Sequence, residues 1–327
     1  MKVCIVGHGM MGTWHSDALQ DTDAALHTLV GRRPEPTQAF AERYGYHKWT
    51  TDLDKALADD AIDIVILANP SELHAQTALA SLSAGKHTLV EIPIAMNLPD
   101  AERVVAEAKA RGLTLGVVHP KRMQPEFVAL RERAQAGEER IRHITGRFYI
   151  HRLENVGATG YRRSWTDNLL WHHTTHLLDF GLWMLDTPVR SLSSFMPPVD
   201  QQTGIPMEVF LGIETEGDHS LVCTGSYYSR EYMFEAFVVT ERDSYRLDSV
   251  GNVLTLGSGS RTPAPWVENC MRVTRDFITA VREGRPPAIP GESVLPAMRI
   301  LQAAQDRWDA RHGEQSLPGR PVSIVSS

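Results

Sequence analysis

Short apolar runs alternate with amphipathic stretches over the first 120 residues. Strands are predicted at the apolar runs Lys2–Val6, Ala25–Val30, Ile62–Ala68, Thr88–Glu91 and Leu113–Val118. The stretches between them predict helices at Thr13–Gln20, Pro36–Tyr44, Leu53–Ala58, Ser71–Ala84 and Pro99–Arg111. Strands that alternate with helices are typical of a doubly wound parallel sheet, so residues 1–120 are predicted to form an α/β domain.

The pattern changes after His119, where β-like runs joined by turn residues become dominant. These runs are Ile144–Leu153, Val209–Thr215, Ser220–Tyr228, Phe234–Thr240, Ser244–Leu247 and Val253–Leu256. Helices are predicted at Gln124–Gln135, Trp171–Leu185, Val267–Glu283 and Ser293–Arg311. Residues 121–327 are therefore predicted to form an α+β domain with an open, mostly antiparallel sheet. Its C-terminal helix is long enough to pack back on the first domain.

Composition narrows the class of protein. The chain has 327 residues, a net charge of −7 and three widely spaced cysteines. A nucleic-acid partner is not expected, because phosphate-binding domains usually carry a basic surface. The cysteines fit packing in a reducing compartment better than a disulfide framework. No apolar run reaches the roughly 18 residues of a membrane span, and the N-terminus lacks a signal-peptide pattern, so a cytoplasmic protein without a membrane partner is expected.

A glycine motif, GHGMMG, follows the first predicted strand and opens the first helix. Gly7, Gly9 and Gly12 fit the G-x-G-x-x-G spacing of the Rossmann dinucleotide site. Gly7 permits the tight turn, Gly9 allows the pyrophosphate to approach the backbone, and Gly12 lets the helix pack on the sheet. The predicted cofactor contacts here are Gly7, His8, Gly9, Met10, Met11 and Gly12.

The end of the second strand favours NADP over NAD. An NAD site usually has an acidic residue about 20 residues after the fingerprint, and Arg32 lies there instead. Arg32 and Arg33 suit a 2′-phosphate, since guanidinium pairs with phosphate through two hydrogen bonds. Glu35 follows closely, so NAD remains a weaker alternative. Further cofactor contacts are predicted where later strands end: Asn69, Pro70, Ser71, His74, Glu91, Ile92 and His119.

Three histidines lie within five positions of the segment LLWHHTTHLLDF, at residues 169–180. On a helix, His172, His176 and Asp179 share one face because they are four and three residues apart. An imidazole held by a carboxylate can transfer protons. Two other interpretations stay open: a zinc site, although no H-E-x-x-H motif or cysteine pair supports it, and plain packing of the helix.

Basic residues flank this segment in an otherwise acidic chain. Lys121 and Arg122 follow the last strand of the first domain, and Arg152, Arg162 and Arg163 precede Trp165. Guanidinium and ammonium groups near one proposed site predict an anionic substrate with more than one carboxylate. Trp165 and Trp171 are candidates to line a pocket for a planar molecule, with core packing as the alternative.

Taken together, GHGMMG, NPSELH, Glu91-Ile92-Pro93 and the histidine helix resemble the Gfo/Idh/MocA oxidoreductase family over the whole chain. The resemblance implies that His176 is the general base. Most members have Glu-Lys-Pro where this chain has Ile92, and an aspartate where it has His172. The family lysine assists substrate binding and proton transfer, so the mechanism here is expected to differ in that part.

The segments RSWTDNLLWHHTTH, EIPIA and HPKRMQP resemble one branch of this family, the dehydrogenases of protocatechuate 4,5-cleavage. This resemblance implies NADP-linked oxidation of 4-carboxy-2-hydroxymuconate-6-semialdehyde, as its cyclic hemiacetal, to 2-pyrone-4,6-dicarboxylate. His172 or His173 would assist His176, and Glu91 and His119 would border the nicotinamide. The substrate is expected to contact Arg122 and Arg163 through its carboxylates, with Lys121, Arg152, Trp165 and His119 nearby.

Other functions remain open at this point. They are a family dehydrogenase that acts on a sugar or cyclitol, a non-catalytic NADP-binding regulator, and a zinc hydrolase. The family resemblance also implies a homodimer that forms through the sheet of the second domain.

Overall fold

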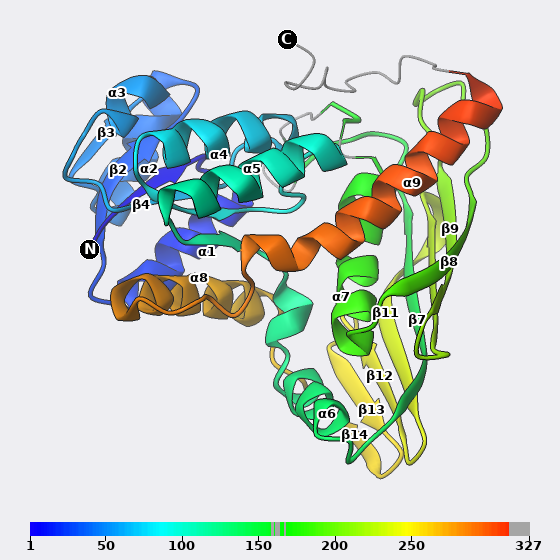
Figure 1. The fold of residues 1–327 in the computed structure, drawn as a ribbon. Helices are drawn as coiled ribbons and strands as arrows, with labels where there is room; N and C mark the ends of the chain where they lie inside the picture. The colour runs from blue at the N-terminus through cyan, green and yellow to red at the C-terminus, as the bar shows by residue number, and fades with distance from the viewer. Residues whose placement is uncertain (158–159, 161–163, 167, 314–327) are drawn as a thin grey trace.

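The computed structural model describes residues 1–157, 160, 164–166 and 168–313. Two sheets lie at opposite sides of the molecule, with helices between and around them (Figure 1). One sheet has six strands and the other has eight. The predicted combination of a parallel Rossmann sheet and an open, mostly antiparallel sheet is confirmed.

The first sheet has the strand order β3-β2-β1-β4-β5-β6, and all its pairs are parallel. This order reverses between β1 and β4, and ligands of such sheets bind outside the carboxyl ends of the strands at that point. The strands are β1 (Lys2–Val6), β2 (Ala25–Val30), β3 (Lys48–Thr50), β4 (Ile64–Leu67), β5 (His87–Val90) and β6 (Leu115–Val117).

The helices of this part begin and end close to the predicted positions. They are α1 (Met10–Gln20), α2 (Pro34–Tyr44), α3 (Leu53–Leu57), α4 (His74–Ser83) and α5 (Leu98–Arg111). A 3₁₀ turn, Ser71–Leu73, precedes α4. The sequence did not predict β3, because its three residues, KWT, are partly or fully exposed and too few to show a period.

The second sheet has the strand order β14-β13-β12-β11-β7-β10-β9-β8. The central pair β7 and β10 is parallel and every other pair is antiparallel. The strands are β7 (Ile141–His151), β8 (Val189–Phe195), β9 (Glu208–Thr215), β10 (Ser220–Ser226), β11 (Tyr228–Thr240), β12 (Ser244–Asp248), β13 (Val253–Leu256) and β14 (Gly259–Arg261). The sequence missed β8 and β14, whose side chains are mostly polar.

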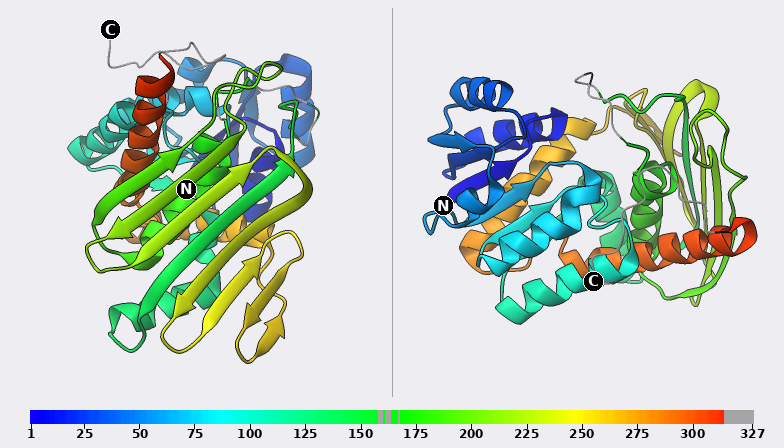
Figure 2. Two further views of the ribbon diagram at one scale, coloured as in Figure 1. Left: turned by 90° about the vertical axis from the view of Figure 1, so that its right-hand side faces the viewer. Right: turned by 90° about the horizontal axis from the view of Figure 1, so that it is seen from above.

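One face of this sheet is covered by helix α7 (Thr175–Leu185), and the other is open (Figure 2, left). The helix packs closely because the sheet and the helix each have a glycine at the contact. A Cβ on Gly146 of β7 would lie 2.8 Å from the Leu177 Cβ, and one on Gly181 would lie 2.5 Å from Leu221 of β10. This close packing fixes α7, and the histidines at its start, against the centre of the sheet.

The end of the chain joins the two parts. Helix α8 (Trp266–Glu283) packs against α1, and Arg275 forms an ion pair with Asp21 at 2.6 Å. Helix α9 (Leu295–His312) contacts both α5 and α7 (Figure 1). A domain boundary at residue 120 therefore separates the two sheets. It does not separate the helices, because α8 follows the second sheet in sequence but packs beside the first.

Two short elements complete the connection from β6 into the second part. The 3₁₀ helix η2 (Pro120–Met123) and the helix α6 (Pro125–Gln135) follow β6 directly. Within the described residues, no helix combines the length and apolarity needed to cross a membrane.

Candidate active site

The glycine turn has the geometry of a dinucleotide site. Gly7 has φ +105°, and a Cβ there would lie 2.4 Å from the Ala68 carbonyl oxygen. A Cβ on Gly12 would lie 2.3 Å from the Gly7 carbonyl oxygen, so both positions require glycine. By contrast, a Cβ on Gly9 would meet no atom within 4 Å. Open space at Gly9, directly before the N-terminus of α1, is where a phosphate would be bound by free backbone N–H groups.

The side chains of this turn are held by α2. His8 Nε2 lies 3.2 Å from Thr37 Oγ1, and its ring centroid lies 5.7 Å from that of Phe40. Burial, opposed by a backbone hydrogen bond, lowers the pKa of His8. Arg32 and Arg33 are exposed between β2 and α2, at the end of the strand where a ribose phosphate would lie.

His74 braces two of the predicted cofactor loops. Its Nε2 lies 2.9 Å from the Asn69 carbonyl oxygen and its Nδ1 lies 2.7 Å from the Pro93 carbonyl oxygen. The side chain is buried. His74 thus connects the loop after β4 to the loop after β5, which indicates a positioning role, not the direct cofactor contact that we predicted. The buried Oδ1 of Asn69 has no hydrogen-bond partner within the described part of the chain, so it can still contact a ligand.

Glu91 is fixed by residues that are distant in sequence. Its Oε1 lies 3.0 Å from His15 Nε2, and His15 Nδ1 lies 2.8 Å from Thr274 Oγ1. His15 comes from α1 and Thr274 from α8, so this buried chain of hydrogen bonds ties three elements together at the end of β5. Neither residue was predicted. The adjacent Ile92 is 6% exposed and packs in the core, where most family members carry lysine.

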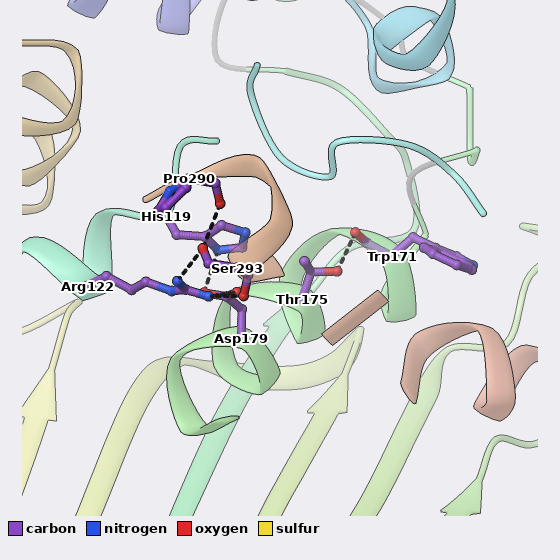
Figure 3. A network of polar contacts seen from close by, with 7 residues as sticks. All are labelled: His119, Arg122, Trp171, Thr175, Asp179, Pro290 and Ser293. Carbon is purple, nitrogen blue, oxygen red and sulfur yellow. Dashed lines mark hydrogen bonds and ion pairs between the residues drawn. The ribbon is translucent and has the colours of Figure 1, made fainter. Parts of the chain in front are cut away.

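The Asp179 carboxylate contacts Arg122 and His119, and not His176 as predicted (Figure 3). Arg122 Nε donates to Asp179 Oδ2 at 2.7 Å, and Arg122 Nη2 donates to Oδ1. His119 Nδ1 lies 3.1 Å from the same Oδ2. Burial raises the pKa of Asp179 and Arg122 opposes that rise. The carboxylate therefore orients Arg122 and His119, whereas the sequence predicted that it would hold His176.

The guanidinium group of Arg122 already donates hydrogen bonds within the protein, so few of its N–H groups remain for a substrate. Besides Asp179, its Nη1 donates to Ser293 Oγ at 2.9 Å and its Nη2 donates to the Ser293 carbonyl oxygen at 3.1 Å. The side chain is buried. We therefore replace its predicted role in carboxylate binding by a positioning role: Arg122 links η2 to α7 and to the turn before α9.

His176 lies in the first turn of α7 with one ring nitrogen unused. Among the described residues, none forms a hydrogen bond to its Nδ1, although this atom is buried. Its ring lies edge-on to His119 and His172, with centroids 6.2 Å from each. Burial lowers the pKa of His176 well below its ordinary value, and His119, His172 and Lys121 lower it further. The imidazole is therefore neutral near pH 7 and can accept a proton.

The two preceding histidines occupy a π-helical turn, Leu170–Thr174, which such sites often contain. His173 is held on both sides: its ring stacks on Phe148 at 3.7 Å, and its Nδ1 lies 2.8 Å from the Tyr227 hydroxyl. His172 lies between the other two rings, 4.2 Å from His173 and 6.2 Å from His176. This order makes His172 the better candidate to assist His176.

Two of the predicted cationic residues lie near the histidines. Lys121 is buried, and its Nζ lies 4.0 Å from the ring centroid of Phe234, which also contacts His176. Arg152 lies over Trp165 and Tyr227, at 5.9 and 5.7 Å from their ring centroids. Tyr227 in turn contacts His173, so Arg152 and Trp165 lie beside the cluster. Arg163 lies outside the described residues.

Over the described ranges, no three His, Cys, Asp or Glu side chains are arranged to hold a metal ion. The cysteines Cys4, Cys223 and Cys270 are buried free thiols in separate places.

Comparisons with known proteins agree with this architecture. Residues 1–119 match the family described as "Oxidoreductase family, NAD-binding Rossmann fold", and residues 125–233 match "Bacterial oxidoreductases, C-terminal". Levoglucosan dehydrogenase, solved in complex with NADH and L-sorbose, superposes with a TM-score of 0.83 at 17% identity. That match covers 95% of this chain and 97% of the other.

Two curated relatives align over nearly the full length. The chain is 32% identical to 4-carboxy-2-hydroxymuconate-6-semialdehyde dehydrogenase of Sphingobium sp. (strain NBRC 103272 / SYK-6), over 92% of this chain and 96% of the relative. It is 23% identical to myo-inositol 2-dehydrogenase of Thermotoga maritima, over 93% and 95% respectively.

Proposed function

The chain belongs to the Gfo/Idh/MocA family of NAD(P)-dependent oxidoreductases, and from this membership we propose that it oxidises a carboxylated cyclic hemiacetal to a lactone. The proposed substrate is 4-carboxy-2-hydroxymuconate-6-semialdehyde and the proposed product is 2-pyrone-4,6-dicarboxylate. One observation carries the proposal: a neutral His176, whose buried Nδ1 has no hydrogen-bond partner among the described residues, lies with Lys121 near the carboxyl ends of the Rossmann strands. The 32% identical relative bears the same substrate in its name.

The residues of the glycine turn fit a dinucleotide. Open space over Gly9 and the buried, unpartnered Oδ1 of Asn69 leave room and a polar contact for it. Gly7, Gly9 and the N-terminus of α1 would hold the phosphates, and Glu91 and His119 would border the nicotinamide. The nicotinamide supplies the hydride acceptor when it is bound.

His176 performs the proton transfer in this proposal. The hemiacetal hydroxyl donates a hydrogen bond to a ring nitrogen of His176, which takes the proton as the carbon loses its hydride and the C=O bond forms. His172, whose ring centroid lies 6.2 Å from that of His176, relays that proton or tunes the pKa of His176. Asp179 acts indirectly, because it fixes His119 beside His176. Arg152 and Lys121 supply the positive charge for the substrate's carboxylates.

NADP is the proposed cofactor because exposed Arg32 and Arg33 stand at the end of β2. Arg32→Asp should weaken NADP binding far more than NAD binding, since it replaces a phosphate partner by a like charge. Fluorescence titration of both cofactors measures this. An unchanged ratio of the two affinities would remove the argument for NADP.

A second candidate function is oxidation of a neutral sugar or cyclitol. It is favoured by the inositol dehydrogenase relative, and by the use of Arg122 in pairing with Asp179, which leaves fewer cations for a carboxylate. Measuring kcat/KM for the carboxylated hemiacetal and for a panel of polyols, inositols and xylose included, separates the two. Our proposal predicts efficient turnover of the hemiacetal alone, and turnover of polyols alone would favour the second function.

The proposal extends to the assembly and the location of the protein. We propose a homodimer that uses the open face of the second sheet, acts in the cytoplasm on a small di- or tricarboxylate, and binds neither nucleic acid nor membranes. The uncovered sheet face supports the first part (Figure 2). The net charge of −7 supports the expectation about nucleic acid.

A further inference from the structure

Lys121 is a buried amine in a largely aromatic environment. It is 2% exposed, and its Nζ donates a hydrogen bond to Ser249 Oγ at 2.9 Å. Two aromatic rings lie near it, with centroids 4.0 Å (Phe234) and 5.4 Å (Trp266) from Nζ. Among the described residues, no carboxylate forms an ion pair with Nζ. A buried ammonium ion without a counter-charge is costly, so this arrangement needs an explanation.

The same two rings also surround His176. Its ring centroid lies 5.1 Å from that of Trp266 and 6.0 Å from that of Phe234. Lys121 and His176 therefore share one aromatic wall, and the charge of Lys121 acts on His176. Ile92, at the end of β5, carries no charge, whereas Lys121 places an amine near His176.

Opposing effects decide whether this amine is charged. Burial favours the neutral form, whereas Asp248 and the two aromatic rings favour the ammonium ion. His176 is a further titratable neighbour, and Arg122, which follows Lys121 in sequence, is already paired with Asp179. Burial dominates and lowers the pKa of Lys121 to about 7. Neutral and charged forms then coexist near neutral pH, and a nearby carboxylate would favour the charged one.

We propose that Lys121 is a proton-coupled anion receptor, which is neutral in much of the free protein and takes up a proton when a carboxylate-bearing ligand binds beside His176. This inference rests on the proposed function, because it requires an anionic substrate. It explains how the protein keeps His176 free of a permanent neighbouring charge and still selects carboxylates. By linkage, ligand affinity must fall as the pH rises above about 7, where protonating the amine becomes harder.

The test is calorimetric titration of 2-pyrone-4,6-dicarboxylate into the protein saturated with NADP⁺. Both molecules are oxidised, so no turnover occurs. Repeating the titration in buffers with different ionisation enthalpies gives the number of protons taken up. We expect uptake of about half a proton at pH 7, more at about pH 8 and almost none at about pH 5.5, as a group half protonated near pH 7 requires.

Variants assign the proton to its residue. Lys121→Arg keeps the charge without titrating, so it should bind the ligand with uptake close to zero. Lys121→Met should bind it at least about tenfold more weakly, because it removes the charge altogether. Lys109→Met, which alters an exposed lysine of α5, is the control and should match the wild type. Undiminished uptake in Lys121→Arg would assign the proton to a histidine and overturn the proposal.

A measurement on the free protein separates this proposal from the proposed function. In NMR spectra of lysine labelled with ¹³C at Cε, one lysine should titrate near pH 7, and its signal should be absent in Lys121→Arg. If every lysine titrated above about pH 9, close to ordinary lysines, the receptor would be refuted whatever the substrate is. Absence of ligand binding by the wild type would instead overturn the proposed function, and the coupling with it.

Discussion

At the scale of single residues, His176 differs from its neighbours because its buried Nδ1 has no partner among the described residues. His119 is engaged with Asp179 and His173 with Tyr227. A ring nitrogen that no neighbour occupies can accept a proton from a ligand. The same geometry that leaves His176 neutral supports its proposed role as the base.

His176→Ala should lower kcat by a factor of about 10² to 10⁴, the usual contribution of a general base, and leave the Kd of NADP nearly unchanged. Because its pKa is lowered, His176 is active above that pKa and loses activity only as the pH falls through it. The acid limb of kcat/KM should therefore lie below pH 6.5, the ordinary histidine value. Equal losses of turnover and NADP affinity would contradict the assignment.

Loss of the Arg122 side chain is predicted to lower the free energy of unfolding more than it weakens substrate binding. Arg122→Ala leaves the Asp179 carboxylate buried without its partner, which should cost about 3–5 kcal/mol of unfolding free energy. Arg190→Ala removes an exposed ion pair with Asp218 and should change stability little. Urea unfolding of both variants provides the comparison. A stable Arg122→Ala protein with weakened substrate binding would restore the role that the sequence suggested.

Some of these residue roles could be predicted from the sequence and some could not. His176 and the glycines lie in local motifs whose spacing carries their chemistry. The partners of Asp179 and Glu91 come from folding: Arg122 is 57 residues from Asp179, and His15 is 76 residues from Glu91. The helical spacing predicted that Asp179 shares a face with His172 and His176, but the packing of η2 against α7 determines which cation meets the carboxylate.

At the scale of elements, the turn between β1 and α1 contains one glycine that the fold requires and one that it does not. Gly12 is required by the fold, because a Cβ would collide with the Gly7 carbonyl oxygen. Gly9 has extended backbone angles, φ −77° and ψ −159°, which alanine also adopts, and a Cβ there meets open space. The fold therefore does not require glycine at position 9, and the open space there suits a ligand that approaches the backbone.

Gly9→Ala and Gly12→Ala form a matched pair. Gly12→Ala should lower the unfolding free energy by about 1–3 kcal/mol, as overpacking does, and impair cofactor binding as a consequence. Gly9→Ala should fold with wild-type stability and still bind NADP more weakly. Thermal unfolding and cofactor titration measure both effects. Wild-type NADP affinity in Gly9→Ala would show that the phosphates lie elsewhere.

The sequence predicted those strands and helices whose hydrophobic pattern was regular and long enough to recognise. Strands β1, β2 and β13 coincide with the predicted ranges, since their residues form continuous apolar or alternating runs. Strand β8, VRSLSSF, lacks such a run, because it lies at the sheet edge and α9 covers it only in part. The π-helical turn before α7 also has no sequence signal, since it depends on how the histidine segment packs against β10.

At the scale of the whole molecule, one face of the second sheet remains uncovered (Figure 2). Phe210 and Phe195 lie directly opposite each other on β9 and β8, and both are exposed. On β11, Glu235 is nearly buried between Arg147 and Arg246. Exposed aromatic residues and a neutralised carboxylate on the strands of one sheet are typical of a surface that a partner covers.

If that surface forms the proposed homodimer, Phe210→Asp should convert the dimer to a monomer, because it places an uncompensated charge in the interface. Trp49→Asp is the control, since Trp49 is a comparably exposed aromatic residue on β3 of the other sheet. Light scattering after size-exclusion chromatography gives the mass of each variant. A monomeric wild type, or a Phe210→Asp protein that remains dimeric, would refute this interface.

We propose that the site oxidises a carboxylated hemiacetal with a nicotinamide cofactor. A single assay can measure this activity. The 4,5-cleavage product of protocatechuate is generated enzymatically, the protein and NADP⁺ are added, and nicotinamide absorbance is followed while mass spectrometry identifies the product. We predict rapid reduction of NADP⁺ with formation of 2-pyrone-4,6-dicarboxylate. No reduction of either NADP⁺ or NAD⁺, by protein shown to bind the cofactor, would contradict the claim.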